Sequence, residues 1–190
     1  MRFGILLLSM IILLPGEASA HIGIHGPAGL AGGLMHPFSG LDHILAMLAV
    51  GMWSGWLGGR FRWAIPAGFL GAAAAGFLIG VGEGAASALV EQGVALSLVG
   101  LGALLFFRAR LPLMVGLPLV VAFGLFHGLA HGSEAGDDPW SFMGGFLIST
   151  ALLHLAGLLL GKLPLQAGLL RIGGTGITAA GMLLFASQLS

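Results

Sequence analysis

Two histidines and an aspartate lie close together near the start of the chain, in the run His36-Pro37-Phe38-Ser39-Gly40-Leu41-Asp42-His43. Residues 44–55, which follow at once, carry no charge, as is typical of a helix that spans a membrane. An ionisable side chain beside such a helix is costly in lipid and by default marks a functional site. Because imidazole and carboxylate bind divalent metals, this first cluster (His36, Asp42 and His43) predicts a cation site.

A second cluster consists of His127 and His131, which are four residues apart, and Glu134, which follows three residues later. If a helix continues that far, the three side chains share one of its faces. Two imidazoles one helical turn apart can bind one metal ion. The alternative is a pair of interfacial histidines hydrogen-bonded to neighbouring helices. Since a first-row metal takes roughly four to six ligands, we expect the helices that carry the two clusters to pack together.

Further candidates are less specific. Asp42 either ligates the metal, orients a ligating imidazole or has a structural role. His154, about two-thirds along a predicted span, is equally a ligand, a relay or a packing residue. Glu91, one turn into another span, either lines the entrance or makes a helix-end hydrogen bond. His21 and His25 either capture metal at the mouth of the site or are simply solvated. The predicted metal-binding residues are therefore His36, Asp42, His43, His127, His131, Glu134, His154, Glu91, His21 and His25.

The composition is that of an all-α integral membrane protein. Of the 190 residues, 57% are hydrophobic and 7% are charged, whereas soluble domains carry about 25% charged residues. The absence of cysteine excludes thiolate metal sites, iron–sulfur clusters and cysteine catalysis. Because the net charge is zero and no basic block exists, nucleic acid is not an expected partner. The expected partners are the lipid bilayer and a divalent metal ion.

Residues 1–20 have the pattern of a cleavable signal peptide. Arg2 precedes an apolar core at 3–14, and Ala18-Ser19-Ala20 is a small-residue cleavage site. An uncleaved first helix is the alternative, although twelve apolar residues are short for a span. We expect a single transmembrane domain over 21–190.

Six predicted spans make up that domain, so the predicted fold is a six-helix transmembrane bundle after a signal peptide. The first span breaks at His36-Pro37, because Pro37 removes a backbone donor and disfavours helix at the residue before it. Such a break is tolerated where its backbone is buried in protein or lines a wet cavity. The spans are about 28–57, 63–82, 87–107, 112–131, 141–161 and 168–188.

The basic residues predict the orientation. They fall in alternate loops, which the positive-inside rule assigns to the cytoplasm. Both mature termini are then periplasmic, and the protein lies in the bacterial cytoplasmic membrane. The residues concerned are Arg60, Arg62, Arg108, Arg110, Lys162 and Arg171.

Glycines recur every four residues in three places, and such ladders let helix backbones approach closely in membranes. The ladders are Gly51/Gly55/Gly59, Gly76/Gly80/Gly84 and Gly124/Gly128/Gly132.

Both clusters belong to longer motifs that resemble those of the HupE/UreJ family of hydrogenase and urease accessory proteins. The resemblance implies a bacterial inner-membrane permease for nickel or cobalt that supplies metalloenzyme assembly. It also implies that the first cluster is essential to transport and that the second contributes. The motifs are the run 36–43 with Leu45-Ala46-Met47-Leu48-Ala49-Val50-Gly51; Phe126-His127-Gly128 with Ala130-His131-Gly132 and Glu134; and Ala151-Leu152-Leu153-His154 with Ala156-Gly157.

We therefore expect a secondary transporter or channel-like permease for Ni²⁺ or Co²⁺, not an enzyme, with the metal as substrate and with no cofactor. Hand-off to hydrogenase or urease maturation proteins would follow. The alternatives are a membrane-bound nickel chaperone, an intramembrane zinc hydrolase and a b-type haem protein that uses His127. The hydrolase is disfavoured because the H-E-x-x-H motif is absent.

Overall fold

A computed structural model describes residues 29–81, 86–163 and 166–189, and within these ranges all regular structure is helical. Five of the helices, α4 to α8, are long and apolar enough to cross a membrane, and α3 is a shorter apolar helix. The chain is thus a multi-pass helical membrane protein. The elements are α2 (Gly29–Met35), η1 (His36–Phe38), α3 (Leu41–Leu57), α4 (Phe61–Gly80), α5 (Ala88–Phe106), α6 (Leu113–Ser133), α7 (Pro139–Gly161) and α8 (Gln166–Ser187). The predicted signal peptide, His21 and His25 lie outside the described residues.

The predicted break at His36-Pro37 is confirmed. Helix α2 ends at Met35, a 3₁₀ turn covers His36–Phe38, and α3 begins only at Leu41. Gly40, the N-cap of α3, is extended (φ −114°, ψ 125°), while the Ser39 hydroxyl donates to the His36 carbonyl oxygen at 2.6 Å. The interruption places His36 before the bend and both Asp42 and His43 in the first turn of α3.

Glycines allow the main helix pairs to pack backbone against backbone. A Cβ atom at Gly51 or Gly55 of α3 would overlap the backbone of α7, and one at Gly128 of α6 would overlap the Ala73 carbonyl of α4. A Cβ atom at Gly76 or Gly80 would likewise overlap the backbone of α6, and one at Gly124 or Gly132 would overlap the backbone of α4. The ladders are therefore packing devices, except at Gly59, which lies in the turn after α3 (φ +52°) and where an added Cβ atom would meet no described atom within 4 Å. Gly84 lies outside the described residues.

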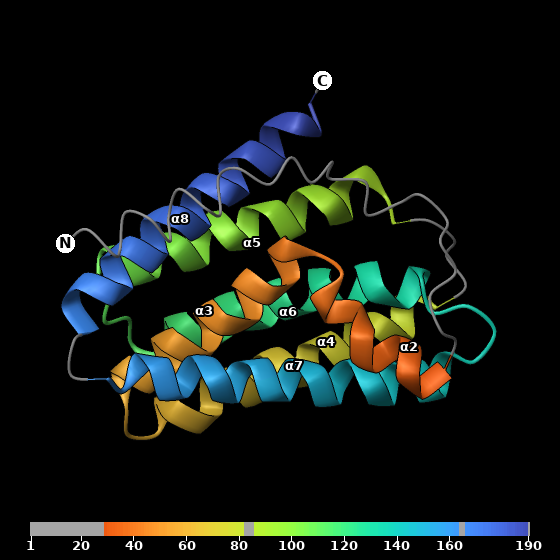
Figure 1. Ribbon diagram of the computed structural model, residues 1–190, viewed down its shortest axis with the longest axis horizontal. Coiled ribbons are helices and arrows are strands. Elements are labelled where there is room, and N and C mark those ends of the chain that lie inside the picture. The colour runs from red at the N-terminus through yellow and green to blue at the C-terminus, as the bar shows by residue number, and fades with distance from the viewer. Residues whose placement is uncertain (1–28, 82–85, 164–165, 190) are drawn as a thin grey trace.

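The observed helix pairs differ from the expectation that the two helices that carry the clusters pack together. Helix α3 packs mainly on α7 and helix α6 mainly on α4, whereas the backbones of α3 and α6 barely touch each other. In Figure 1, α3 and α6 lie between α5 on one side and α4 and α7 on the other. The two cluster-bearing helices are thus not a closely packed pair, because each devotes its glycine face to another helix. Large side chains fill the interior instead, including fully buried Trp53, Phe69, Phe77 and Phe146.

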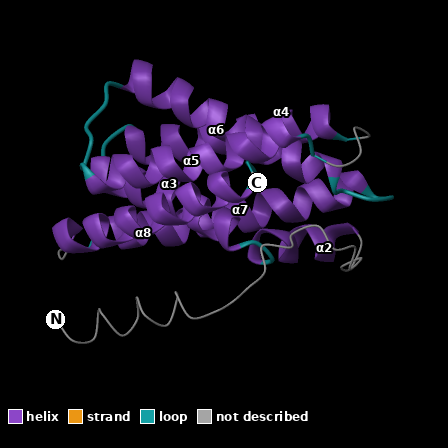
Figure 2. Cartoon of the chain, turned by 90° about the horizontal axis from the view of Figure 1, so that it is seen from above, coloured by secondary structure: helices purple, strands orange, loops and turns teal. Residues whose placement is uncertain are grey.

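Charge is divided between the two ends of the bundle. The connections that join α3 to α4 and α5 to α6 lie at the left of Figure 1, beside the end of α7 and the start of α8. Arg60, Arg108 and Lys162 lie there. The α6–α7 connection, with its acidic residues, lies at the opposite end, where α2 runs alongside α7 (Figure 2). This division is the one that the sequence predicts.

Candidate metal site

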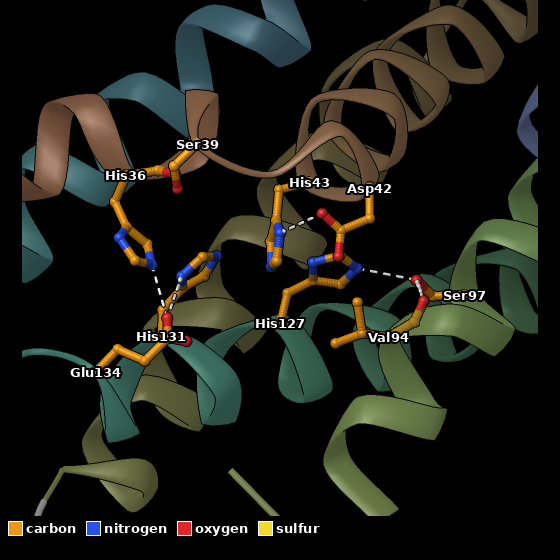
Figure 3. A network of polar contacts seen from close by, with 9 residues as sticks. All are labelled: His36, Ser39, Asp42, His43, Val94, Ser97, His127, His131 and Glu134. Carbon is orange, nitrogen blue, oxygen red and sulfur yellow. Dashed lines mark hydrogen bonds and ion pairs between the residues drawn. The ribbon is translucent and has the colours of Figure 1, made fainter. Parts of the chain in front are cut away.

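Four imidazoles meet inside the bundle, two from each predicted cluster (Figure 3). The ring centroids of His36 and His131 are 4.7 Å apart, those of His131 and His43 are 4.3 Å apart, and those of His43 and His127 are 5.1 Å apart. The expected convergence of the clusters is therefore confirmed. The side chains bridge the space between α3 and α6 because these helices do not pack directly.

The inner group, which we define as His43, His127 and His131, brings one ring nitrogen of each residue within 4.8 Å of the others. His127 is fully buried and His131 is 1% exposed. Among the described residues, His43 Nε2, His127 Nδ1 and both nitrogens of His131 are buried without a hydrogen-bond partner. Since a buried polar atom without a partner is costly, a cluster of residues with such atoms suggests a ligand.

The outer group, which we define as His36, His131 and Glu134, also holds three donor atoms within 4.8 Å. Nε2 of His36 lies 2.7 Å from Oε2 of Glu134, and Nδ1 of His131 lies 3.7 Å from the same oxygen. The side chains of His36 and Glu134 are each 26% exposed, so this group is partly exposed while most of the inner group is buried. His131 belongs to both groups.

Glu134 is not part of helix α6, which ends at Ser133. The condition set for a shared helical face, that the helix continues through Glu134, is therefore not met, yet the C-cap position still brings its carboxylate to His131 and His36. Burial alone would raise the pKa of Glu134, but the imidazoles of His131 and His36 outweigh it and hold that pKa below its usual range. The carboxylate is thus ionised at neutral pH and available to a cation.

Asp42 lies beside His43 and belongs to neither group. Its Oδ1 atom is 2.9 Å from His43 Nδ1. If that nitrogen carries the proton and donates, Nε2 of His43 is left with a free lone pair. A carboxylate that orients a ligating imidazole in this way is common around protein-bound metals. The geometry fits the orienting alternative for Asp42.

Ser97 of α5 is a site residue that the sequence reasoning missed. Its Oγ atom lies 2.9 Å from Nε2 of His127 (Figure 3). A lone serine within an apolar span gives no signal of such a role, because serine in a helix commonly bonds its own backbone.

The remaining candidates, His154 and Glu91, are members of neither group. His154 is 3% exposed and lines a pocket of about 220 Å³ between α4 and α7. The ring of Phe69 contacts both His127 and His154, with centroids 5.4 and 5.1 Å away. Nε2 of His154 has no hydrogen-bond partner within the described ranges. Glu91 lies half-buried in the first turn of α5 and joins neither group.

Fold and site together define a multi-pass helical membrane protein with a buried imidazole–carboxylate centre that could hold a divalent metal ion. The chain belongs to the HupE / UreJ protein family, whose model matches residues 8–184. It is 41% identical to Protein HupE of Rhizobium leguminosarum bv. viciae over 178 residues, which cover 91% of this chain and 92% of that protein. No solved structure matches the chain. The resemblance seen in the motifs is thereby confirmed.

Proposed function

We propose that this protein is a permease that admits Ni²⁺ or Co²⁺ through the bacterial cytoplasmic membrane, as a secondary transporter or a channel-like path. The observation that carries the proposal is the meeting of four imidazoles and one carboxylate within a bundle of membrane helices. A bare cation cannot cross hydrocarbon, so protein ligands must replace its water.

The donor chemistry supports a borderline metal. Imidazole suits Ni²⁺, Co²⁺ and Zn²⁺, and a carboxylate adds negative charge, whereas a soft ion such as Cu⁺ would favour cysteine, which this sequence lacks. The choice among the three metals depends on geometry and availability rather than on intrinsic affinity.

The two groups suggest a sequence of steps. In this proposal the ion first binds the more exposed outer group and then passes to the inner group by exchanging ligands. His131 belongs to both groups, so it can hold the ion while His36 and Glu134 are replaced by His43 and His127. His154 lies beyond the ring of Phe69 and is a candidate for a later contact.

We further propose a topology of six spans over residues 21–190, after a signal peptide at 1–20. The first span consists of α2 and α3 with the break between them, and the end with the basic residues faces the cytoplasm. The outer group then faces the periplasm, as does each mature terminus. Mass spectrometry of the N-terminus and a reporter fused after Ser190 test this. An intact Met1, or a reporter active only in the cytoplasm, would contradict it.

Transport, rather than catalysis, is the proposed role, with the metal passed on to hydrogenase or urease maturation proteins. Uptake of radioactive nickel into liposomes that contain the purified protein separates a permease from a membrane-bound chaperone. His131→Phe keeps a flat ring among the neighbouring aromatic rings while it removes both nitrogens. We expect time-dependent uptake by the parent and loss of most of it in this variant. Binding without uptake by the parent would favour the chaperone, and equal uptake by the variant would contradict the proposed path.

A further inference from the structure

Ser97 makes two polar contacts at once in the interior of the bundle. It is completely buried in α5. Its hydroxyl donates to the carbonyl oxygen of Val94 at 2.7 Å, and its Oγ atom lies 2.9 Å from Nε2 of His127 on α6 (Figure 3). The contact therefore joins one helix to the imidazole of another.

The number of hydrogens decides the direction of the second bond. A serine hydroxyl has one hydrogen and two lone pairs. A carbonyl oxygen only accepts, so both contacts are hydrogen bonds at once only if that hydrogen goes to Val94 and the oxygen accepts from His127, which requires a proton on Nε2 of His127. In neutral imidazole one nitrogen is protonated and the other is not. Nδ1 of His127 is then the atom with the free lone pair.

The lone pair on Nδ1 of His127 is available to a metal ion bound by the inner group. Nδ1 of His127 is buried, and no described residue provides it with a hydrogen-bond partner. His127 belongs to the inner group, next to the ring of His43. In the opposite tautomer, Nε2 would accept from Ser97 only if the hydroxyl gave up its bond to Val94, and Nδ1 would present a hydrogen instead of a lone pair to the other imidazoles.

We propose that Ser97 is a positioning residue that fixes His127 in its Nε2-protonated form and presents Nδ1 of that imidazole to the transported ion. The inference rests on the proposed function, since it assigns Ser97 to the same metal path. Asp42 and His43 form the mirror arrangement: there Nδ1 is bonded, at 2.9 Å, and Nε2 is left for the ion. Partners of this kind fix the ring orientation of metal-binding histidines, and their loss typically costs about 10–100-fold in metal affinity or activity.

Ser54 provides a matched control. It too is completely buried, in α3, and its hydroxyl donates to the Gly51 carbonyl oxygen at 2.8 Å, three residues earlier, just as Ser97 donates to Val94. Within the part of the chain that the structure describes, Ser54 has no imidazole partner comparable to His127. The helix bond is therefore common to both serines and the imidazole contact distinguishes them.

The first measurement needs no variant at position 97. Carbon–nitrogen correlation NMR of histidine-labelled protein in lipid bilayers reports which ring nitrogen carries the proton, and the His127 signal is identified by its loss in His127→Gln. We expect the metal-free protein to show His127 protonated at Nε2. A signal from the Nδ1-protonated form would overturn the proposal, whether or not the protein transports nickel.

The second measurement compares nickel uptake by Ser97→Ala, Ser97→Thr and Ser54→Ala. We expect Ser97→Ala to raise KM roughly 10–100-fold and to shift the His127 signal towards a mixture of tautomers. Ser97→Thr keeps the hydroxyl and should restore both readings, and Ser54→Ala should match the parent. An unchanged tautomer and KM in Ser97→Ala would refute the role of Ser97. If the parent itself takes up no nickel, the proposed function fails, while the NMR result still decides the part about Ser97.

Discussion

Nε2 of His36 lies 2.7 Å from Oε2 of Glu134, so the break in the first predicted span is joined to the end of helix α6. His36 belongs to the 3₁₀ turn between α2 and α3, and Glu134 is the C-cap residue of α6. Neither residue lies within an α-helix, so the contact could not be predicted from regular helical spacing. Their contact nevertheless completes the more exposed of the two candidate metal-binding groups.

We predict that the purified protein binds about one nickel ion at a time. Both groups need His131, and two divalent cations on groups that share a ligand would repel each other strongly at low dielectric. Equilibrium dialysis with radioactive nickel measures the stoichiometry. Two ions bound together would show that the groups are independent sites and would rule out the proposed transfer through His131.

Replacing Asp42 with asparagine should weaken nickel binding by roughly 10–100-fold. The amide keeps the size of the side chain but removes the negative charge beside His43 Nδ1. Competition with a metal-sensitive dye measures the dissociation constant. Asp138→Asn serves as the control, because Asp138 caps α7 by accepting from the Ser141 backbone N–H and belongs to neither group. Equal dissociation constants for Asp42→Asn and the parent would show that Asp42 is not coupled to the site.

The effect of Glu134→Gln on nickel affinity should be the same at about pH 5.5 as at about pH 7.5, because a carboxyl with a lowered pKa is ionised at both. Its charged form is lost only below that lowered pKa. A fall in affinity shared by parent and variant would come from protons that compete with the metal at ligands other than Glu134. Calorimetry at the two pH values tests this. A variant that matches the parent only at the lower pH would indicate that Glu134 is protonated there.

Gly128→Ala should destabilise the bundle by about 1–3 kcal/mol, because the new methyl group would overlap the Ala73 carbonyl of α4. Gly71→Ala is the matched control on α4, since a Cβ there meets no described atom within 4 Å and alanine favours helix by about 0.5–1 kcal/mol. Unfolding of the purified protein in mixed detergent micelles measures both changes. Similar stability of the two variants would show that the α4–α6 contact is looser than described.

The sequence by itself determined the helices. Hydrophobic length and the short polar connections predict spans at 63–82 and 141–161, and the structure has helices at Phe61–Gly80 and Pro139–Gly161. The break before α3 could also be predicted, because the loss of a donor and the steric effect of Pro37 are local properties of the chain. His36, Asp42, His43, His127, His131 and Glu134 stood out because ionisable groups are costly in an apolar setting.

Only the tertiary structure decided which of these residues meet. A membrane helix is apolar on its lipid-facing and protein-facing sides alike, so hydropathy does not reveal which face packs or against which neighbour. That choice depends on close backbone contacts such as Gly51 against α7 and Gly128 against α4. Those contacts leave room between α3 and α6 for the imidazoles, bring Ser97 to His127 and keep His154 behind Phe69. Such relationships are long-range, and no spacing along the chain encodes them.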